Sequence, residues 1–314
     1  MKVLAIAVNT FKEAVRNRIL YVLLFFAVLV LLGAWVASTL SIFGKEKIIR
    51  DLGVAAINVI AVLIAVFVGV GQIYNDLDKK TIYTIVSKPI SRWQFLLGKY
   101  LGLMLTIAVN VLIMTFFFLA VLYFRHFISD EVISQAMGVA MGEAAGGGSI
   151  LLYYIVSFLK SVFMAIGTIL SLGLYNTDAT VGIMGASLLT ILELCVITAF
   201  AILFSSFSSP TLSAFLTLTA FIIGRANRDI YYFGELLVSR ARGFENLEAG
   251  QVMAFYLSRA AAFLTPNLDR FNKRDLVAEM QAIPFDPLAV LYGLGYAAVV
   301  LMVAMVIFNR RNFK

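Results

Sequence analysis

The sequence predicts an all-α polytopic integral membrane protein with six transmembrane helices, and three observations lead to this fold class. Hydrophobic residues make up 61% of the 314 residues and charged residues only 14%, whereas soluble domains average about 45–50% and about 25%. Several apolar runs approach or exceed the roughly 20 residues that a membrane helix needs. Basic residues also gather on some of the connections between these runs and not on others. A soluble core cannot hide this much apolar surface, so the chain is predicted to reside in a membrane.

Six apolar runs are the predicted transmembrane helices. Five of them have the length of a span or nearly so, and the short one, 211–224, becomes long enough if its helix starts among the serines at Ser205–Ser209. The first run starts after eighteen amphipathic residues and is too long for a cleavable signal peptide. In chain order the runs are Ile19–Ser41, Val54–Ile73, Tyr100–Phe124, Ile183–Phe204, Thr211–Gly224 and Pro287–Phe308.

A seventh apolar run, Leu151–Leu174, carries Lys160 near its middle. A lysine at mid-bilayer costs about 2.5–3.5 kcal/mol on insertion scales. We therefore expect this run to dip into the membrane or lie on it, within an insertion at 125–181 on the outer face. A true span with a snorkelling lysine is the open alternative. The small-residue stretch Met137–Gly148 predicts a loop hinge, and close helix approach through its GxxxG spacings is the alternative there.

Basic residues predict how the chain is oriented. The N-terminal stretch before the first run carries four basic residues against one acid, and loop 74–99 carries five against two. The C-terminal tail has three basic residues and no acid, whereas 125–150 has one arginine against three acids. Because cytoplasmic loops carry an excess of lysine and arginine, we expect both termini and loop 74–99 in the cytoplasm, in a multi-pass protein of the cell (inner) membrane.

Loop 225–286, between the fifth and sixth runs, then lies on the outer side. It holds eight basic and eight acidic residues, so its charge neither supports nor opposes that side. Two of its segments, Asp229–Ala241 and Leu247–Leu264, have the spacing of amphipathic helices.

Several function classes are excluded by what the sequence lacks. One cysteine, Cys195, and one histidine, His126, leave no disulfide scaffold and no metal cluster. No GxxxxGK[ST] phosphate loop, HExxH or GxSxG motif occurs. We therefore expect no enzymatic activity, no metal site and no cofactor in this chain. The net charge of +7 is interpreted as a topology signal, so no nucleic-acid partner is expected. The eleven methionines are interpreted as packing residues and not as copper ligands.

Polar side chains within the predicted spans are the candidates for a translocation path. Glu193 is the one acid in the five confident spans, which also hold the amides Asn58, Gln72 and Asn110. A carboxylate at membrane depth needs a partner, and we expect Asn110, Gln72 or Lys160 to supply it. Glu193 is either a polar hinge on the path or a structural hydrogen bond between helices. Carriers usually show several such groups or repeated halves, whereas these spans hold one acid and the chain shows no internal repeat. A stand-alone secondary carrier or channel is therefore the alternative function and not the first one.

The cytoplasmic loop Tyr74–Gly102 contains a pattern that predicts two helices with a break between them. Leu77, Ile82, Ile85 and Val86 fall on one face of a predicted amphipathic helix over 78–86. Lys88–Pro89 ends that helix, because proline disfavours the helical conformation in the residue before it.

The second helix of this loop is predicted to start at Ser91. Gln94, three residues later, completes a capping box, and the helix runs through Trp93 and Phe95 at the interface into the third span. Such an arrangement can pass a push from a cytoplasmic partner into the membrane. An interfacial anchor is the alternative for the first half, since Lys88 and Arg92 suit anionic headgroups as well as acidic protein groups.

The stretch KKTIYTIVSKPISRWQFLLGKYLG, 79–102, resembles the first cytoplasmic loop of type-2 ATP-binding-cassette (ABC) exporter permeases. The similarity is to permeases like that of the nitrous-oxide-reductase copper-maturation system. ELCVITAFAILFSSFSSPTLSAFLTL, 193–218, looks like the family's fourth span, inner turn and fifth span. NTFKEAVRNRILYVLLFF, 9–26, looks like its interfacial helix and first span, and LTPNLDRFN, 264–272, is similar to its last loop. Residues 125–181 are longer than the family leads us to expect.

This resemblance implies one permease domain over 1–314, with an interfacial helix at 1–18 and a coupling loop at 74–99. Two permeases would pair, as a homodimer or with a paralogue, and substrate would move outward between them. Each would dock a separate ATPase subunit, which holds the ATP and Mg²⁺, and the missing phosphate loop fits this division. The implied docking residues are Asp78, Lys80, Thr81, Lys88, Pro89 and Arg92.

Overall fold

The computed structural model describes residues 2–40, 45–78, 91–127, 178–241, 243–246, 248–279, 283 and 286–310. All of the elements within these ranges are helices, which confirms the predicted all-α class. Four are long and apolar enough to cross a membrane. They are α3 (Lys45–Asp78), α5 (Arg92–Phe127), α8 (Asp178–Ser205) and α13 (Pro287–Arg310).

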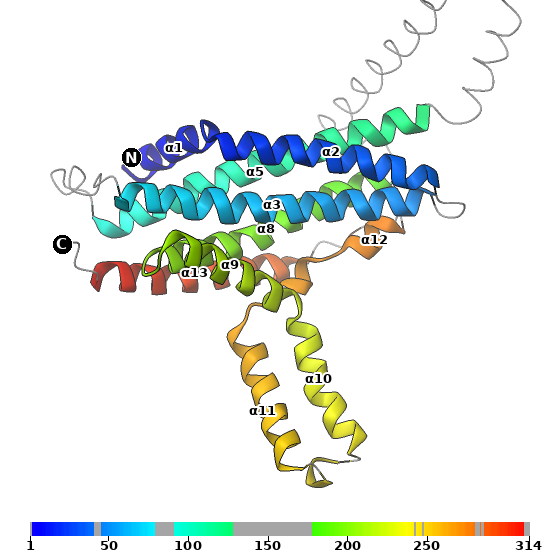
Figure 1. The fold of residues 1–314 in the computed structure, drawn as a ribbon, viewed down its shortest axis with the longest axis vertical. Helices are drawn as coiled ribbons and strands as arrows, with labels where there is room; N and C mark the ends of the chain where they lie inside the picture. The colour runs from blue at the N-terminus through cyan, green and yellow to red at the C-terminus, as the bar shows by residue number, and fades with distance from the viewer. Residues whose placement is uncertain are drawn as a thin grey trace, which may run out of the picture.

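A bent pair of helices at the N-terminus is long and apolar enough for a fifth crossing only when the two helices are counted as one span. α1 (Lys2–Val15) and α2 (Arg18–Leu40) meet at an angle of 62°. These helices make the chain compatible with a multi-pass membrane protein, while the count of six crossings stays a prediction. The long helices lie side by side in one bundle, and the start of α1 and the end of α13 lie at the same end of it (Figure 1).

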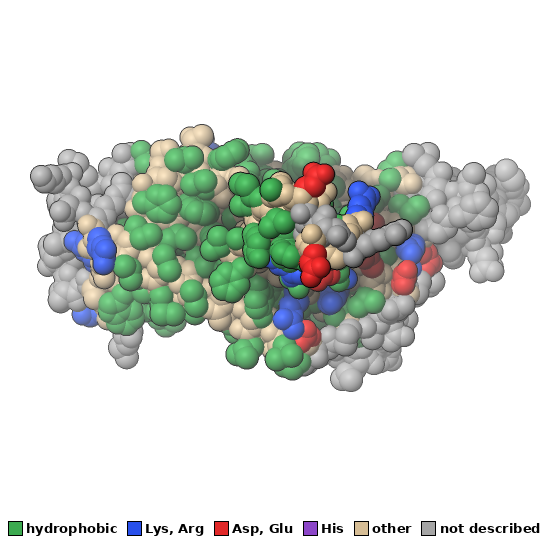
Figure 2. Space-filling model, turned by 90° about the horizontal axis from the view of Figure 1, so that it is seen from below, with side chains coloured by type: hydrophobic (Ala, Val, Ile, Leu, Met, Phe, Trp, Pro, Cys, Tyr) green, Lys and Arg blue, Asp and Glu red, His purple; other side chains and the backbone are tan. Residues whose placement is uncertain are grey.

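One face of the molecule has the distribution of side chains expected of a protein in lipid. Figure 2 shows a face on which hydrophobic side chains cover most of the left half, with lysine and arginine at its left edge. Charged side chains of both signs gather in the right half. A wide apolar band between charged regions is what contact with a bilayer favours.

Helix α3 forms the centre of the bundle, and 78% of its most apolar 18-residue stretch is buried. It packs against α2, α5 and α8. A Cβ at Gly53 would collide with the ring of Phe118 on α5, so the close contact between α3 and α5 at this point needs a glycine. α5 and α8 are joined by Thr115 and Ser187, whose Oγ atoms lie 2.7 Å apart. α3 starts nine residues before the predicted Val54, because its first turns pack against the loop that precedes α13.

Helix α9 (Pro210–Arg225) follows α8 after a short turn. The condition under which run 211–224 would be long enough, a helix start among Ser205–Ser209, is not met. Ser205 ends α8 and 206–209 form the turn, in which the Ser208 hydroxyl meets that of Ser213 at 2.6 Å. At 1.5 Å per residue its 16 residues reach about 24 Å, which is short of the roughly 30 Å hydrocarbon layer.

The two amphipathic helices predicted in loop 225–286 are present. α10 (Asn227–Arg240) and α11 (Ala249–Leu264) form a hairpin that projects sideways from the bundle, joined through the 3₁₀ turn η1 (Phe244–Asn246) (Figure 1). The chain returns through η2 (Leu268–Phe271) and α12 (Arg274–Ala278). α12 is tied to the start of α3 by Arg274 Nε and Asp51 Oδ1, 2.7 Å apart.

Several expectations fall outside the described residues. They are the fate of 151–174 with Lys160, the hinge at 137–148, most of the insertion at 125–181, and the coupling-loop residues 79–90.

Candidate functional site

The coupling loop is bounded by two helices of the bundle. α3 ends at Asp78 and α5 begins at Arg92. Lys80, Thr81, Lys88 and Pro89 lie between them, outside the described residues, and for Asp78 only the backbone is described. As predicted, the helix that leaves the loop continues without a break into a span, and it reaches Phe127. Its 36 residues correspond to about 54 Å of unbroken helix.

The first turn of α5 is fixed to the end of α13. Arg92 Nη1 donates hydrogen bonds to the carbonyl oxygens of Asn309, at 2.9 Å, and Phe308, at 3.4 Å. These carbonyls belong to the last turn of α13, where helix geometry leaves them without partners. The ring of Phe95 stacks on that of Phe308 with centroids 6.4 Å apart. Phe95 is therefore buried between helices and not at the interface, whereas Trp93 is 49% exposed.

Only half of the predicted capping box forms at the start of α5. The Ser91 amide donates to Gln94 Oε1 at 3.4 Å. The Ser91 hydroxyl has no hydrogen-bond partner among the described residues. The packing of Phe95 and the contacts of Arg92 hold this helix start in addition to the cap.

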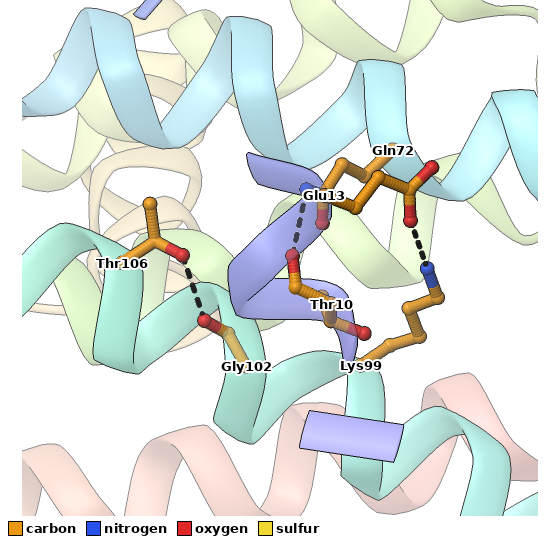
Figure 3. A network of polar contacts seen from close by, with 6 residues as sticks. All are labelled: Thr10, Glu13, Gln72, Lys99, Gly102 and Thr106. Atoms are coloured by element: carbon orange, nitrogen blue, oxygen red, sulfur yellow. Dashed lines mark hydrogen bonds and ion pairs between the residues drawn. The ribbon is translucent and has the colours of Figure 1, made fainter. Parts of the chain in front are cut away.

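Helix α1 ties the two helices that bound the loop to each other (Figure 3). Gln72 Nε2, in the last turns of α3, donates to the Thr10 carbonyl at 3.1 Å. Lys99 Nζ, in the third turn of α5, lies 3.2 Å from Glu13 Oε2. The Lys99 side chain is only 4% exposed, so the opposite charge of Glu13 offsets part of the cost of burying its ammonium group. Both helices next to the loop are therefore bonded to α1.

Two glycines let α1 lie directly on α5. A Cβ at Gly98 would meet Ile6 at 2.7 Å, and a Cβ at Gly102 would meet the Ala7 carbonyl oxygen at 2.5 Å. Such close contact through glycines four residues apart is typical of packing between membrane helices. The GxxxG spacing of Gly98 and Gly102 is the sequence signal from which this contact could be predicted. One face of α1 is therefore packed against α5, which the prediction of an interfacial helix at 1–18 did not include.

Glu193 lies in the middle of α8 and is 1% exposed. Of its expected partners, Asn110 and Gln72 bond elsewhere, and Lys160 lies outside the described residues. Instead, Arg225 at the end of α9 places its Nε 2.9 Å from Glu193 Oε1 as an ion pair and donates from Nη2 to Oε2 at 3.0 Å. Asn58 of α3 donates to the same Oε2 at 2.8 Å and accepts from Arg225 at 2.9 Å.

The other two intramembrane amides have separate contacts. Asn110 donates to the Thr106 carbonyl in its own helix at 2.7 Å. Gln72 belongs to the α1 contact described above. The structure therefore does not bring Gln72, Asn110 and Glu193 together. Thr106 in turn donates to the Gly102 carbonyl at 2.9 Å (Figure 3).

The arrangement consists of helix contacts and one buried ion pair. No group of three or more His, Cys, Asp or Glu that could hold a metal occurs within the described part of the chain. What these contacts can do is mechanical: they connect the two ends of loop 79–90 to α1 and α13, and they join α3, α8 and α9 through Glu193. A comparison with known protein families and with curated proteins found no match to this chain.

Proposed function

We propose that the chain is the permease subunit of a type-2 ABC exporter in the cell (inner) membrane, with both ends in the cytoplasm. A separate ATPase subunit would dock at loop 79–90 and supply ATP hydrolysis with Mg²⁺. A second permease, identical or paralogous, would complete the path along which substrate moves outward. The resemblance of 79–102 to the coupling loop of that family supports this function.

One structural observation carries the proposal furthest. The helix that leaves the loop, α5, is continuous for 36 residues, and its first turns are fixed to both α1 and α13 through Lys99 and Arg92. A force applied at the loop would therefore move α5 together with two other helices. An anchor loop on the lipid surface would need no such connection.

The docking test uses a charge reversal at Lys88, with the exposed Lys12 of α1 as its matched control. Arg92 is a poor choice, because its guanidinium holds the α13 carbonyls. The tagged chain is co-expressed with a nucleotide-binding subunit that carries a GxxxxGK[ST] loop and is purified in detergent. Lys88→Glu should lose most of the bound ATPase subunit, and Lys12→Glu should keep it.

The lipid-anchor interpretation gives a different result in the same test. Detergent removes the bilayer, so an anchor residue would tolerate the change, and both variants would retain the ATPase subunit equally. That outcome would overturn docking at Lys88.

A stand-alone secondary carrier is the second candidate, and the buried Glu193 favours it. An acid at this depth paired with Arg225 resembles the groups that carriers place on an ion path. The purified single chain in vesicles should then move a solute under an ion gradient without ATP, and Glu193→Gln should abolish that movement. The ABC proposal expects no such flux.

A further inference from the structure

The hairpin of α10 and α11 has a rigid base. Asn227, in the first turn of α10, donates to the carbonyls of Ala262 and Thr265 at the end of α11, at 2.8 and 3.0 Å. A Cβ at Gly234 would collide with the hydroxyl of Ser258, so the two helices touch at that point. The direction in which each helix face points is therefore fixed relative to the other helix.

The face of α11 turned away from α10 is apolar. Successive residues are about 100° apart around a helix, so a residue two positions from a contact residue points the opposite way. Tyr256 stands two positions before Ser258. The one charged residue of α11, Arg259, is turned toward α10, where it pairs with Glu235 at 3.2 Å and lies 3.7 Å over the ring of Tyr231. The exposed large side chains of α11 are Met253, Tyr256, Leu257, Phe263 and Leu264.

The outward face of α10 differs in character. Tyr232 stands two positions before Gly234 and so matches Tyr256 in its placement on the other helix. Around it the exposed residues include the charged Arg228, Asp229 and Arg240 and also the apolar Phe233 and Leu236. The exposed side of α11 is therefore apolar, whereas that of α10 combines charged and apolar side chains.

The bundle sets the depth and direction of this hairpin. α9 rises about 24 Å from its start before α10 leaves the bundle, which brings the base close to the far boundary of a roughly 30 Å hydrocarbon layer. In Figure 1, α11 lies on the side of the hairpin nearer the end of α13, and α10 on the side nearer α12. The outward face of α11, which is turned away from α10, therefore points toward the depth at which the apolar length of α13 lies.

We propose that the α10–α11 hairpin lies flat on the bilayer, with the outward face of α11 in the lipid and α10 facing water. Residues 227–264 carry four arginines against four acids, so apolar burial and not attraction to anionic lipid holds the hairpin in place. The inference is independent of the proposed ABC function, since a carrier would present the same surface.

The test compares the two matched tyrosines in the full chain. Tyr256→Cys and Tyr232→Cys are made in a Cys195→Ala background, labelled with the fluorophore NBD, and reconstituted in phosphatidylcholine vesicles. Doxyl-labelled lipid should quench most of the emission at position 256 and little at 232, and aqueous iodide should do the reverse. Met253→Cys and Ser239→Cys form a second pair that should give the same split. Added phosphatidylglycerol should change neither result.

Three outcomes would overturn the inference. Equal quenching of both labels by iodide would mean that the hairpin stands in water. Protection at position 256 from both quenchers, lost when the protein is diluted with lipid, would mean that a second copy covers this face. Lipid quenching that requires phosphatidylglycerol would mean that charge, and not apolar burial, holds the hairpin down.

Discussion

At the scale of single residues, the contact between Glu193 and Arg225 joins α8 to α9 through a buried carboxylate. An ionised carboxylate inside a span costs several kcal/mol unless a partner compensates it. Arg225 gives Glu193 an opposite charge, and Asn58 closes a triangle of polar contacts with both of them. Three helices, α3, α8 and α9, therefore depend on one another through a single acid.

Removing Arg225 should destabilise the chain far more than removing an exposed arginine. Arg225→Met leaves Glu193 buried without its counter-charge, and we expect the free energy of unfolding to fall by about 3 kcal/mol, at the low end of the usual range because the Arg225 side chain is 23% exposed. Arg228→Met is the control: its pair with Asp269 spans 3.6 Å at 62% exposure and should cost less than about 1 kcal/mol.

The measurement for these two variants is thermal unfolding of the purified chain in detergent. The double variant Glu193→Gln/Arg225→Met should recover part of the loss, because it leaves no buried charge unpaired. Equal midpoints for Arg225→Met and Arg228→Met would show that Glu193 is not held by Arg225.

The need of Glu193 for a partner could be predicted from sequence, but the partner itself was missed. A span's composition does not reveal which of its faces meets which neighbour, and Asn110 bonds within its own helix instead. The signal lay in the hairpin of α8 and α9. Glu193 stands 12 residues before Ser205, and Arg225 stands 15 after Pro210. The offset of three residues is about 4.5 Å along the helix, which the long arginine side chain bridges.

At the scale of helices, the contact between α1 and α5 brings together the elements around the coupling loop. Gly98 and Gly102 bring the backbones together, and the buried pair of Lys99 and Glu13 lies beside them. Because the end of α3 also bonds to α1 through Gln72, the two helices that bound the loop share one support.

A methyl group at Gly102 should separate these helices. Gly102→Ala gains up to about 1 kcal/mol of helix propensity, but its Cβ would meet the Ala7 carbonyl and Thr10 at 2.5 Å, and such overpacking costs about 1–3 kcal/mol. We expect a lower unfolding midpoint in detergent. Gly71→Ala in α3 is the control, because nothing lies within 4 Å of its added Cβ. Its midpoint should stay or rise, and a fall as large as that of Gly102→Ala would contradict this account.

Helix positions could be predicted from sequence better than helix ends. The apolar runs gave the centres of α3, α5, α8 and α13, because burial in lipid needs about 20 apolar residues whatever the neighbours are. The ends depend on tertiary contacts. α3 begins at Lys45 because α12 packs there, and α9 begins at Pro210 because the serines before it form a turn.

At the scale of the whole molecule, one end of the bundle brings together the elements that border loop 79–90. The start of α1, the end of α13 and both borders of loop 79–90 meet there (Figure 1). The chain itself has no phosphate loop. In the proposed function, another subunit hydrolyses ATP at this end and this chain converts the resulting movement into transport.

The most direct test of this account is to identify what co-purifies with the tagged chain from its native membrane. The account predicts a subunit that carries a GxxxxGK[ST] loop, and an Mg²⁺-dependent ATP hydrolysis that disappears when that subunit is stripped away. A chain that purifies without any nucleotide-binding subunit, hydrolyses no ATP and yet carries solute under an ion gradient would contradict it.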